Sequence, residues 1–231
     1  MSGPEIVILT GAGVSAESGL GTFRDTDGIW AKFDPRDLAT PEAFERDPDR
    51  VLAFYNERRR QAAQAEPNDA HLALGQLDRA LGERLLLATQ NVDDLHERGG
   101  ARALHMHGSL FVASCAACGT RRNWSDDITA AMACPGCDAR RLRPDVVWFG
   151  EMPQGLDAIY EALEGCRIFA SIGTSGEVQP AASFVLFALA AGADCYDINI
   201  EAAYGRGFTH HLIGPATEQV PRWVDQILAE V

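Results

Sequence analysis

Short apolar runs alternate with helical patterns along most of this chain, and this alternation limits the possible folds more than any other sequence feature. The runs that predict strands are 5–10, 84–90, 102–108, 166–174 and 194–201. The segments with helical spacing are 68–82, 156–165, 181–193 and 220–230. Strands that alternate with helices predict a parallel sheet with helices on both faces. The expected fold class is therefore α/β with a Rossmann-like layout.

Two stretches interrupt this alternation. Residues 20–65 are loop-rich at first and then helical, and residues 111–147 contain two pairs of cysteines. A chain of 231 residues is long enough for one sizeable core into which a small module is inserted. We therefore expect both stretches to lie on the rim of the sheet.

The charge of the chain argues against two classes of partner. The net charge is −13, and Lys32 is the single lysine. An acidic surface repels the phosphates of nucleic acids and of acidic membranes. No apolar run approaches the roughly 20 residues that a membrane span needs, and no secretory signal is visible. We expect a cytoplasmic protein with no nucleic-acid or membrane partner.

The first predicted strand runs directly into GAGVSAESG at 11–19. Gly11 and Gly13 would let the backbone approach a pyrophosphate, and Ala16 occupies the third small position of a G-x-G-x-x-G/A turn. A tight turn without a ligand is the alternative, but the placement after the first strand favours a dinucleotide. A dehydrogenase would usually place an acidic residue about 20 residues further on. That region, TFRDTDGIW, reads as a loop.

The cysteine pairs follow the pattern Cys115-x2-Cys118-x15-Cys134-x2-Cys137. Two knuckles with this spacing place four thiolates around one zinc ion in a closed tetrahedral shell. A closed shell leaves no position for a catalytic water, so we predict a structural zinc. A zinc ribbon can also bind nucleic acid, but the acidic net charge weighs against that alternative.

Polar side chains follow two of the predicted strands. Gln90, Asn91 and Asp93 lie at the end of one run, and His105 and His107 lie at the end of the next. The carboxyl ends of neighbouring parallel strands are where an open α/β sheet binds its ligand. The alternation of a strand puts both histidines on one face, so their spacing does not separate a catalytic histidine from a packed or metal-adjacent one.

Tyr55 and Arg58 lie three positions apart in a stretch that reads as an amphipathic helix, so they share one face. Together they could present a hydroxyl and a guanidinium to one small anion. A core tyrosine beside a solvated arginine is the alternative. Arg59 and Arg60 do not fit the spacing, and we expect both to be solvated.

These motifs together resemble one family, the sirtuins, which are NAD-dependent protein-lysine deacylases. The chain is similar to the bacterial type that resembles the lysine desuccinylase and demalonylase (class III) branch. The similar blocks follow the family's order and are GAGVSAESGLGTFRDTDGIW (11–30), PNDAHLAL (67–74), TQNVDD (89–94), HGS (107–109), both cysteine pairs, VVWFGE (146–151), GTS (173–175) and NIE (199–201).

The resemblance implies a single catalytic domain over 1–231, with NAD held between a Rossmann-like part and a small domain. The large part would comprise approximately 1–29, 66–110 and 148–231. The small domain would comprise approximately 30–65, which is helical, and 111–147, which is the zinc ribbon.

The resemblance also implies which residues contact the co-substrate NAD. Those facing the pyrophosphate and adjoining ribose would be Gly11, Ala12, Gly13, Ser15, Glu17 and Ser18. Those of the cofactor loop would be Thr22, Phe23 and Arg24, in a fold that orders NAD for cleavage and not for hydride transfer. Those around the nicotinamide would be Gln90, Asn91, Val92 and Asp93. Those facing the adenosine half would be Gly173, Thr174, Ser175, Asn199, Ile200, Glu201 and Ala216.

In the reaction that the resemblance implies, the acyl-lysine carbonyl oxygen attacks C1′ of the nicotinamide ribose and nicotinamide leaves. His107, which precedes the glycine, matches the catalytic base, whereas His105 does not. His107 would take a proton from the ribose hydroxyls, and Asn91 and Asp93 would complete the catalytic group. The products would be free lysine, nicotinamide and 2′-O-acyl-ADP-ribose.

The partners implied by the resemblance are proteins or peptides that contain acylated lysine. The peptide would add as an extra strand between two segments, Val147, Trp148 and Phe149 on one side and Gly176, Glu177 and Val178 on the other. In sirtuins that remove acidic acyl groups, a Tyr-x-x-Arg pair lies at the end of the acyl channel. Tyr55 and Arg58 match that pair, so removal of acetyl, succinyl and malonyl groups is expected.

Three other functions fit parts of the sequence. A mono-ADP-ribosyltransferase would use the same fold, and a nicotinamide dehydrogenase would use the same sheet. A zinc-ribbon nucleic-acid module would use the four cysteines. The absent ribose-binding acid argues against the dehydrogenase, and the acidic net charge argues against the nucleic-acid module.

Overall fold

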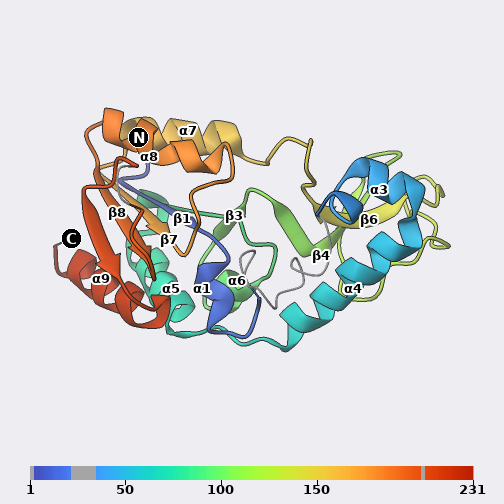
Figure 1. Cartoon of the computed structure of the whole chain (residues 1–231), viewed down its shortest axis with the longest axis horizontal. Helices are drawn as coiled ribbons and strands as arrows, with labels where there is room; N and C mark the ends of the chain where they lie inside the picture. The colour runs from blue at the N-terminus through green and yellow to red at the C-terminus, as the bar shows by residue number, and fades with distance from the viewer. Residues whose placement is uncertain (1–2, 22–34, 204–205, 231) are drawn as a thin grey trace.

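The structure is a computed structural model, and it describes residues 3–21, 35–203 and 206–230 (Figure 1). Six parallel strands form the main sheet in the order β3-β2-β1-β7-β8-β9. They are β1 (Ile6–Thr10), β2 (Leu85–Thr89), β3 (Ala103–His105), β7 (Ile168–Ile172), β8 (Asp194–Asn199) and β9 (His210–Ile213). The strand order reverses between β1 and β7, as in the Rossmann fold. The predicted fold class is confirmed.

Helices cover both faces of this sheet (Figure 1). On one face, α5 (Asp69–Leu81) and α9 (Ala216–Glu230) pack against Ile6 and Ile8 of β1. On the other face, α7 (Leu156–Gly165) and α8 (Phe184–Ala190) pack against Val7 and Leu9. Alternate side chains of a strand point to opposite faces, so a sheet covered on both sides needs apolar residues at every position. The continuous run in β1 meets this requirement.

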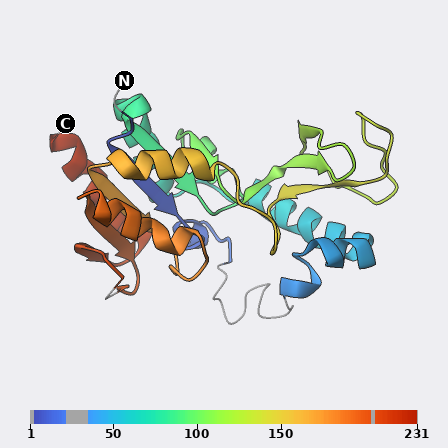
Figure 2. The same cartoon turned by 90° about the horizontal axis from the view of Figure 1, so that it is seen from above.

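The described parts of the two interruptions form one module. Its helices are α3 (Pro41–Arg46) and α4 (Pro48–Gln64), and its antiparallel sheet has the order β5-β4-β6. The strands are β4 (Gly108–Cys115), β5 (Arg121–Asn123) and β6 (Leu142–Val146). Phe44 and Leu52 from the helices share one buried cluster with Leu110, Leu142 and Trp148. This module lies beside the main sheet (Figure 2), and we propose the boundaries predicted above for the small domain.

Short helical segments connect these elements. They are α1 (Gly13–Ala16), η1 (Pro35–Asp37), η2 (Gly82–Arg84), α6 (Leu95–Arg98) and η3 (Ala181–Ser183). Among the described residues, no helix is both long and apolar enough to cross a bilayer.

Several predicted boundaries were wrong. The strand predicted over 102–108 ends at His105, and a turn at 106–107 leads into β4. Gly108 makes this turn possible, because its φ is 78° and a Cβ there would collide with the carbonyl of Asp145. Strand β9 was not predicted, since it is a short edge strand that begins with two histidines. Helix α9 begins at Ala216, before the predicted start at 220.

Candidate active site

The two glycine-rich turns meet where the strand order of the sheet reverses. The N–H of Gly11 donates to the carbonyl of Ile172 (3.0 Å), and that of Gly13 donates to the carbonyl of Gly173 (2.8 Å). A Cβ on Gly13 would lie 2.7 Å from the Gly173 oxygen, and Gly173 has a φ of 59°. These glycines are therefore required for the close packing of the two turns. That packing sets the crevice at the carboxyl ends of β1 and β7, the position at which such sheets bind ligands.

His107 lies in the turn after β3 and is held by the end of β2. Its Nδ1 lies 3.0 Å from the carbonyl oxygen of Gln90. A carbonyl only accepts hydrogen bonds, so Nδ1 carries the proton and Nε2 carries the lone pair. Burial lowers the pKa of His107, although the bond to Gln90 opposes that shift. The ring is thus neutral at neutral pH and can accept a proton at Nε2.

His105 has a different environment. Its Nδ1 lies 3.0 Å from the carbonyl oxygen of Asn91, and its Nε2 lies 3.0 Å from a carboxylate oxygen of Glu97. Both partners are acceptors, so the ring must carry two protons to make both bonds. Burial by itself would lower the pKa of His105, but Glu97 and the Asn91 carbonyl raise it above its ordinary value. In its doubly protonated form His105 ties α6 to the loop after β2 and cannot serve as a base.

Ser15 is the centre of a group of buried polar side chains that contacts the loop after β2. Its hydroxyl donates to Asp93 Oδ2 (3.3 Å) and accepts from the side-chain amide of Asn91 (3.1 Å). Burial raises the pKa of Asp93, while the N–H of Leu95 and the hydroxyl of Ser15 oppose that shift. Three residues predicted from two separate motifs, Ser15 from one and Asn91 and Asp93 from the other, are thus brought together. Val92, predicted with them, is half-buried against the core of the small domain.

Sequence reasoning missed two members of this group, Asn68 and His71. His71 Nε2 lies 3.3 Å from the Ser15 hydroxyl, and burial lowers the pKa of His71 to about 4. The Asn68 side chain caps α5 and also donates to the Ser18 hydroxyl (3.0 Å). An asparagine followed three residues later by a polar residue marks a helix start. That signal could have identified Asn68 as a cap, but not its contact with Ser18.

The residues predicted for the adenosine half lie around the ends of β7 and β8. The side-chain amide of Gln90 donates to the Thr174 hydroxyl (2.9 Å), and that of Asn199 donates to the Thr174 carbonyl (2.8 Å). Ser175 is half-buried in the same loop, whereas Ile200 and Glu201 are exposed. These contacts connect Gln90, which was predicted to lie near the nicotinamide, to Thr174 and Asn199, which were predicted to face the adenosine half.

Glu17 and Ala216 meet at the start of α9. The Glu17 carboxylate accepts from the backbone N–H of Thr217 (3.2 Å) and from the Thr217 hydroxyl, and Ala216 is buried beside it. In this structure Glu17 therefore caps a helix. Ala12 is half-buried in the turn after β1. The residues predicted in the cofactor loop, Thr22, Phe23 and Arg24, lie outside the described residues.

The segment predicted to pair with a peptide uses its own N–H groups internally. The N–H of Val147 donates to the His107 carbonyl (2.9 Å), and that of Phe149 donates to the Ala39 carbonyl (2.9 Å). Trp148 is buried, and its backbone N–H donates to the Glu151 carboxylate (2.8 Å). A peptide strand would therefore depend on carbonyl groups along this segment.

The opposite segment is more open. Gly176 is half-buried, Glu177 is exposed and Val178 is 39% exposed. Phe149, across from it in the prediction, is 50% exposed. Two apolar side chains that water can reach, on segments from different parts of the chain, are compatible with a peptide between them.

Tyr55 and Arg58 occupy different environments on α4. The Tyr55 ring is buried, its hydroxyl accepts from Trp148 Nε1 (3.0 Å), and burial raises its pKa to about 12. Arg58 is half-buried, with its guanidinium 5.8 Å from the centre of the Phe54 ring. Burial lowers the pKa of Arg58, whereas the neighbouring Tyr55 and Asp93 oppose that shift. Arg58 thus lies within electrostatic reach of the loop that carries Asp93.

The prediction that Arg59 is solvated was wrong. Arg59 is buried, its Nε donates to the Leu110 carbonyl (2.6 Å), and its Nη1 donates to the side chain of Asn56 (2.8 Å) and to the carbonyl of Asp126 (3.2 Å). One guanidinium therefore joins α4 to β4 and to the segment after β5. Helical spacing puts Arg59 beside Asn56 and away from Arg58, but spacing does not reveal that the zinc ribbon covers that side.

We expect Arg59→Met to destabilise the protein by about 2–3 kcal/mol, because buried carbonyls lose a charged hydrogen-bond donor. The matched control is Arg60→Met on the same helix. Arg60 is exposed and pairs with Glu57 and Asp127 at the surface, so its loss should leave stability unchanged. Urea unfolding of both variants measures the difference. Equal midpoints would contradict the role of Arg59.

The four paired cysteines form one cluster. The sulfurs of Cys115 and Cys137 are 3.8 Å apart, those of Cys118 and Cys134 are 3.7 Å apart, and all four lie within 4.8 Å of one another. Four sulfurs each about 2.3 Å from a central zinc have separations of about 3.8 Å. The dimensions and the all-thiol donor set thus fit a closed structural zinc site, as predicted.

Comparisons with known proteins agree with this architecture. The chain matches the model of the Sir2 family over residues 11–180. It is 50% identical over 233 residues to the NAD-dependent protein deacylase of Escherichia coli (strain K12), covering 99% of this chain and 84% of that protein. It is 50% identical over 236 residues to the NAD-dependent protein deacylase of Caulobacter vibrioides, covering 98% of each chain.

A solved structure supports the same assignment. The crystal structure of a Sir2 homologue in complex with NAD superposes with a TM-score of 0.88 at 40% identity, covering 97% of this chain and 90% of the other. Similarity over nearly the full length, in both sequence and fold, leaves one conclusion. This chain belongs to the Sir2 family, the sirtuins.

Proposed function

We propose that this protein is an NAD-dependent protein-lysine deacylase that releases nicotinamide and 2′-O-acyl-ADP-ribose. One observation of this chain carries the proposal. His107 is a neutral imidazole with its proton on Nδ1, bound to the Gln90 carbonyl, and so presents Nε2 as a base beside the crevice of the sheet. The names of the relatives above support the same activity.

The residues that would hold NAD are those gathered at the crevice. The fit is supported by the close glycine turns at Gly11, Gly13 and Gly173 and by the polar group around Ser15. When bound, NAD supplies the glycosidic bond to nicotinamide whose cleavage accompanies removal of the acyl group. Asn91 and Asp93 would orient the ribose, and His107 would remove a proton from its hydroxyls. The zinc would hold the small domain and take no part in the chemistry.

The test is to incubate the protein with NAD and an acetyl-lysine peptide and to analyse the products by mass spectrometry. We expect nicotinamide, free lysine peptide and 2′-O-acetyl-ADP-ribose in equal amounts. ADP-ribose attached to protein would indicate a mono-ADP-ribosyltransferase. Formation of the reduced cofactor with a small substrate would indicate a dehydrogenase.

The pH dependence of kcat/KM should separate the two histidines. Because burial lowers the pKa of His107, the acid limb should lie below the ordinary histidine value of about 6.5. The pKa of His105 is raised, so both of its hydrogen bonds are intact at low pH, and one of them is lost as the pH rises through this raised pKa. We expect His105→Asn to change the alkaline limb of the kcat/KM profile and to leave the acid limb in place. A pH–rate profile in which the variant moves the acid limb would contradict this assignment.

We further propose that the acyl pocket accepts succinyl and malonyl groups in addition to acetyl. A carboxylate taken out of water needs a charged or hydrogen-bonding partner. The guanidinium of Arg58, half-buried and within electrostatic reach of Asp93, supports such a role, since arginine offers a two-pronged donor to a carboxylate. Tyr55 is neutral, because burial raises its pKa to about 12, and would contribute its hydroxyl.

We expect Arg58→Met to cost roughly 2–5 kcal/mol of transition-state stabilisation for succinyl and malonyl peptides and to leave deacetylation nearly unchanged. The physical reason is that only the acidic acyl groups lose an ionic partner. Steady-state kcat/KM with matched acetyl, succinyl and malonyl peptides measures the effect, with Arg60→Met as the control on the same helix. Equal losses for all three peptides would show that Arg58 is structural.

A further inference from the structure

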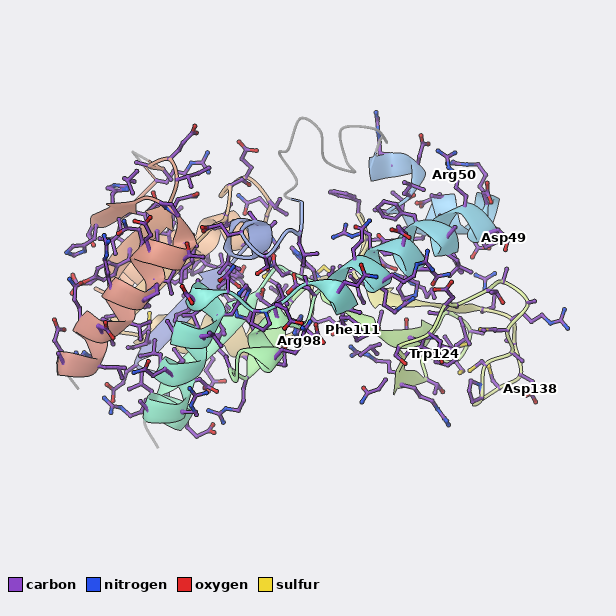
Figure 3. The ribbon with its side chains drawn as sticks, turned by 90° about the horizontal axis from the view of Figure 1, so that it is seen from below. Asp49, Arg50, Arg98, Phe111, Trp124 and Asp138 are labelled. Atoms are coloured by element: carbon purple, nitrogen blue, oxygen red, sulfur yellow. The ribbon has the colours of Figure 1, made fainter. Side chains whose placement is uncertain are left out.

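The side chain of Trp148 connects the predicted peptide segment to the helix of the proposed acyl pocket. Trp148 belongs to the segment 147–149 that follows β6, but its ring is buried. The indole N–H donates to the hydroxyl of Tyr55 at 3.0 Å. Tyr55 lies midway along α4, which Figure 3 shows running from the labelled Arg50 beside the strands of the small domain. One hydrogen bond therefore joins the segment that would hold the peptide backbone to the helix that would bind the acyl group.

This bond fixes the direction in which the Tyr55 hydroxyl can act. An indole N–H only donates, so the phenol oxygen is the acceptor of the bond from Trp148. Burial raises the pKa of Tyr55 to about 12, so the hydroxyl keeps its proton at neutral pH. Within the described part of the chain, Trp148 is the one hydrogen-bond partner of this hydroxyl. The phenol proton is therefore left for a ligand.

A partly buried ion pair holds the Trp148 ring in place. The guanidinium of Arg143 lies over the indole, 3.4 Å from the ring centre. Its Nη1 and Nη2 donate to the two carboxylate oxygens of Glu151 at 2.6 and 2.9 Å. The same carboxylate accepts the backbone N–H of Trp148 at 2.8 Å. Contacts to the face of the ring and to the backbone thus fix the direction in which the indole N–H points.

We propose that Trp148 is a specificity-determining residue of the acyl pocket, because it makes Tyr55 a hydrogen-bond donor to the carboxylate of a succinyl or malonyl group. Arg143 is then a positioning residue that acts through the Trp148 ring. This inference rests on the acyl pocket proposed above. Arg58 has no acceptor atom on its guanidinium, so both side chains would meet the acyl group as donors. Such a pocket favours an acyl group that ends in a carboxylate and disfavours one that ends in an amine.

The first test compares two acyl groups of similar shape on one peptide. One is succinyl-lysine, and the other is 4-methylpentanoyl-lysine, in which methyl groups replace the carboxylate oxygens. Trp148→Phe keeps an aromatic ring and removes the indole N–H. We expect it to lower the ratio of kcat/KM for the succinyl peptide to that for the methylpentanoyl peptide by roughly fivefold or more. A change in packing or in peptide binding would affect both substrates alike, so an unchanged ratio would overturn the proposal.

A double-mutant cycle tests whether Trp148 acts through Tyr55. Tyr55→Phe should itself lower the ratio, since the pocket loses a donor. In the Tyr55→Phe protein, the further change Trp148→Phe should alter the ratio by less than about twofold, because no hydroxyl remains to be oriented. The same loss with and without the hydroxyl would show that Trp148 acts in another way, and the proposal would then be wrong.

Arg143→Met tests the positioning role and leaves both rings in place. It removes the cation from the face of Trp148 and should lower the same ratio about threefold. Arg141→Met is the matched control, because Arg141 is exposed and pairs with Glu45 at the surface. Its loss should leave the ratio unchanged. Equal ratios in the two variants would overturn the role of Arg143, and would decide against the whole proposal if Trp148→Phe failed to fold.

Binding without NAD separates this inference from the proposed activity. Calorimetry with the full chain should show tighter binding of the succinyl peptide than of the methylpentanoyl peptide, and Trp148→Phe should reduce that difference. If the protein turned over no acyl peptide yet showed this binding pattern, the deacylase proposal would fail and the role of Trp148 would stand. If it deacylated both peptides in a ratio that Trp148→Phe left unchanged, only the role of Trp148 would fail.

Discussion

His107→Tyr is expected to remove acyl transfer while leaving the protein folded. General acid–base catalysis commonly contributes about 10²- to 10⁴-fold to a rate, and tyrosine, which remains protonated at neutral pH, cannot act as the base. The effect should appear in kcat with each of the acetyl, succinyl and malonyl peptides, because the base acts after the acyl group has been bound. Steady-state release of 2′-O-acyl-ADP-ribose measures it.

The control for this variant is the histidine two positions earlier. His105 donates to Asn91 and Glu97, so His105→Asn should alter stability and the alkaline limb but retain most of the rate at neutral pH. Thermal melting of both variants tests whether the fold is intact. Retained turnover by a folded His107→Tyr variant would disprove the role of His107 as base.

Removal of zinc should abolish activity through loss of the small domain. In isolated zinc-finger peptides, binding of a structural zinc contributes about 10–16 kcal/mol to folding. Here Cys115 and Cys134 belong to the same buried cluster as Leu52, Tyr55 and Trp148. Loss of the metal should therefore loosen the ribbon, helix α4 and the segment that follows β6 together.

The experiment combines a chelator with the variant Cys134→Ser. Both should lower zinc content, thermal stability and deacylation in parallel. Cys166→Ser is the matched control, because Cys166 is also buried but lies outside the four-cysteine cluster. A zinc-free protein with normal melting and full rate would contradict a structural role.

Part of the site could be predicted because it depends on short-range pattern. A closed zinc site needs four thiols, commonly in two close pairs. The sequence shows this spacing directly in Cys115, Cys118, Cys134 and Cys137. The glycine turn after β1 could be located in the same way. The sequence analysis explained these glycines by the approach of a pyrophosphate. In the structure, the contact that excludes a Cβ at Gly13 comes from Gly173, about 160 residues away.

Other parts depended on which segments pack together. Arg58 and Arg59 are neighbours in sequence, and helical geometry predicts only that they face different directions. Arg59 is buried because β4 and the segment after β5 place the carbonyls of Leu110 and Asp126 within hydrogen-bond distance of its guanidinium. Without those carbonyls, solvation would be the better state for an arginine.

The sequence by itself determined the alternation of strands and helices, the zinc ligands and the family. Each of these depends on the spacing of residues that are close in sequence or on short motifs. Only the tertiary structure decided how the environments of the two candidate histidines differ. His105 and His107 differ through the partners of their ring nitrogens, a carboxylate and a carbonyl for one and a single carbonyl for the other. The proton content of a histidine depends on these contacts across the fold, and no spacing along the chain contains them.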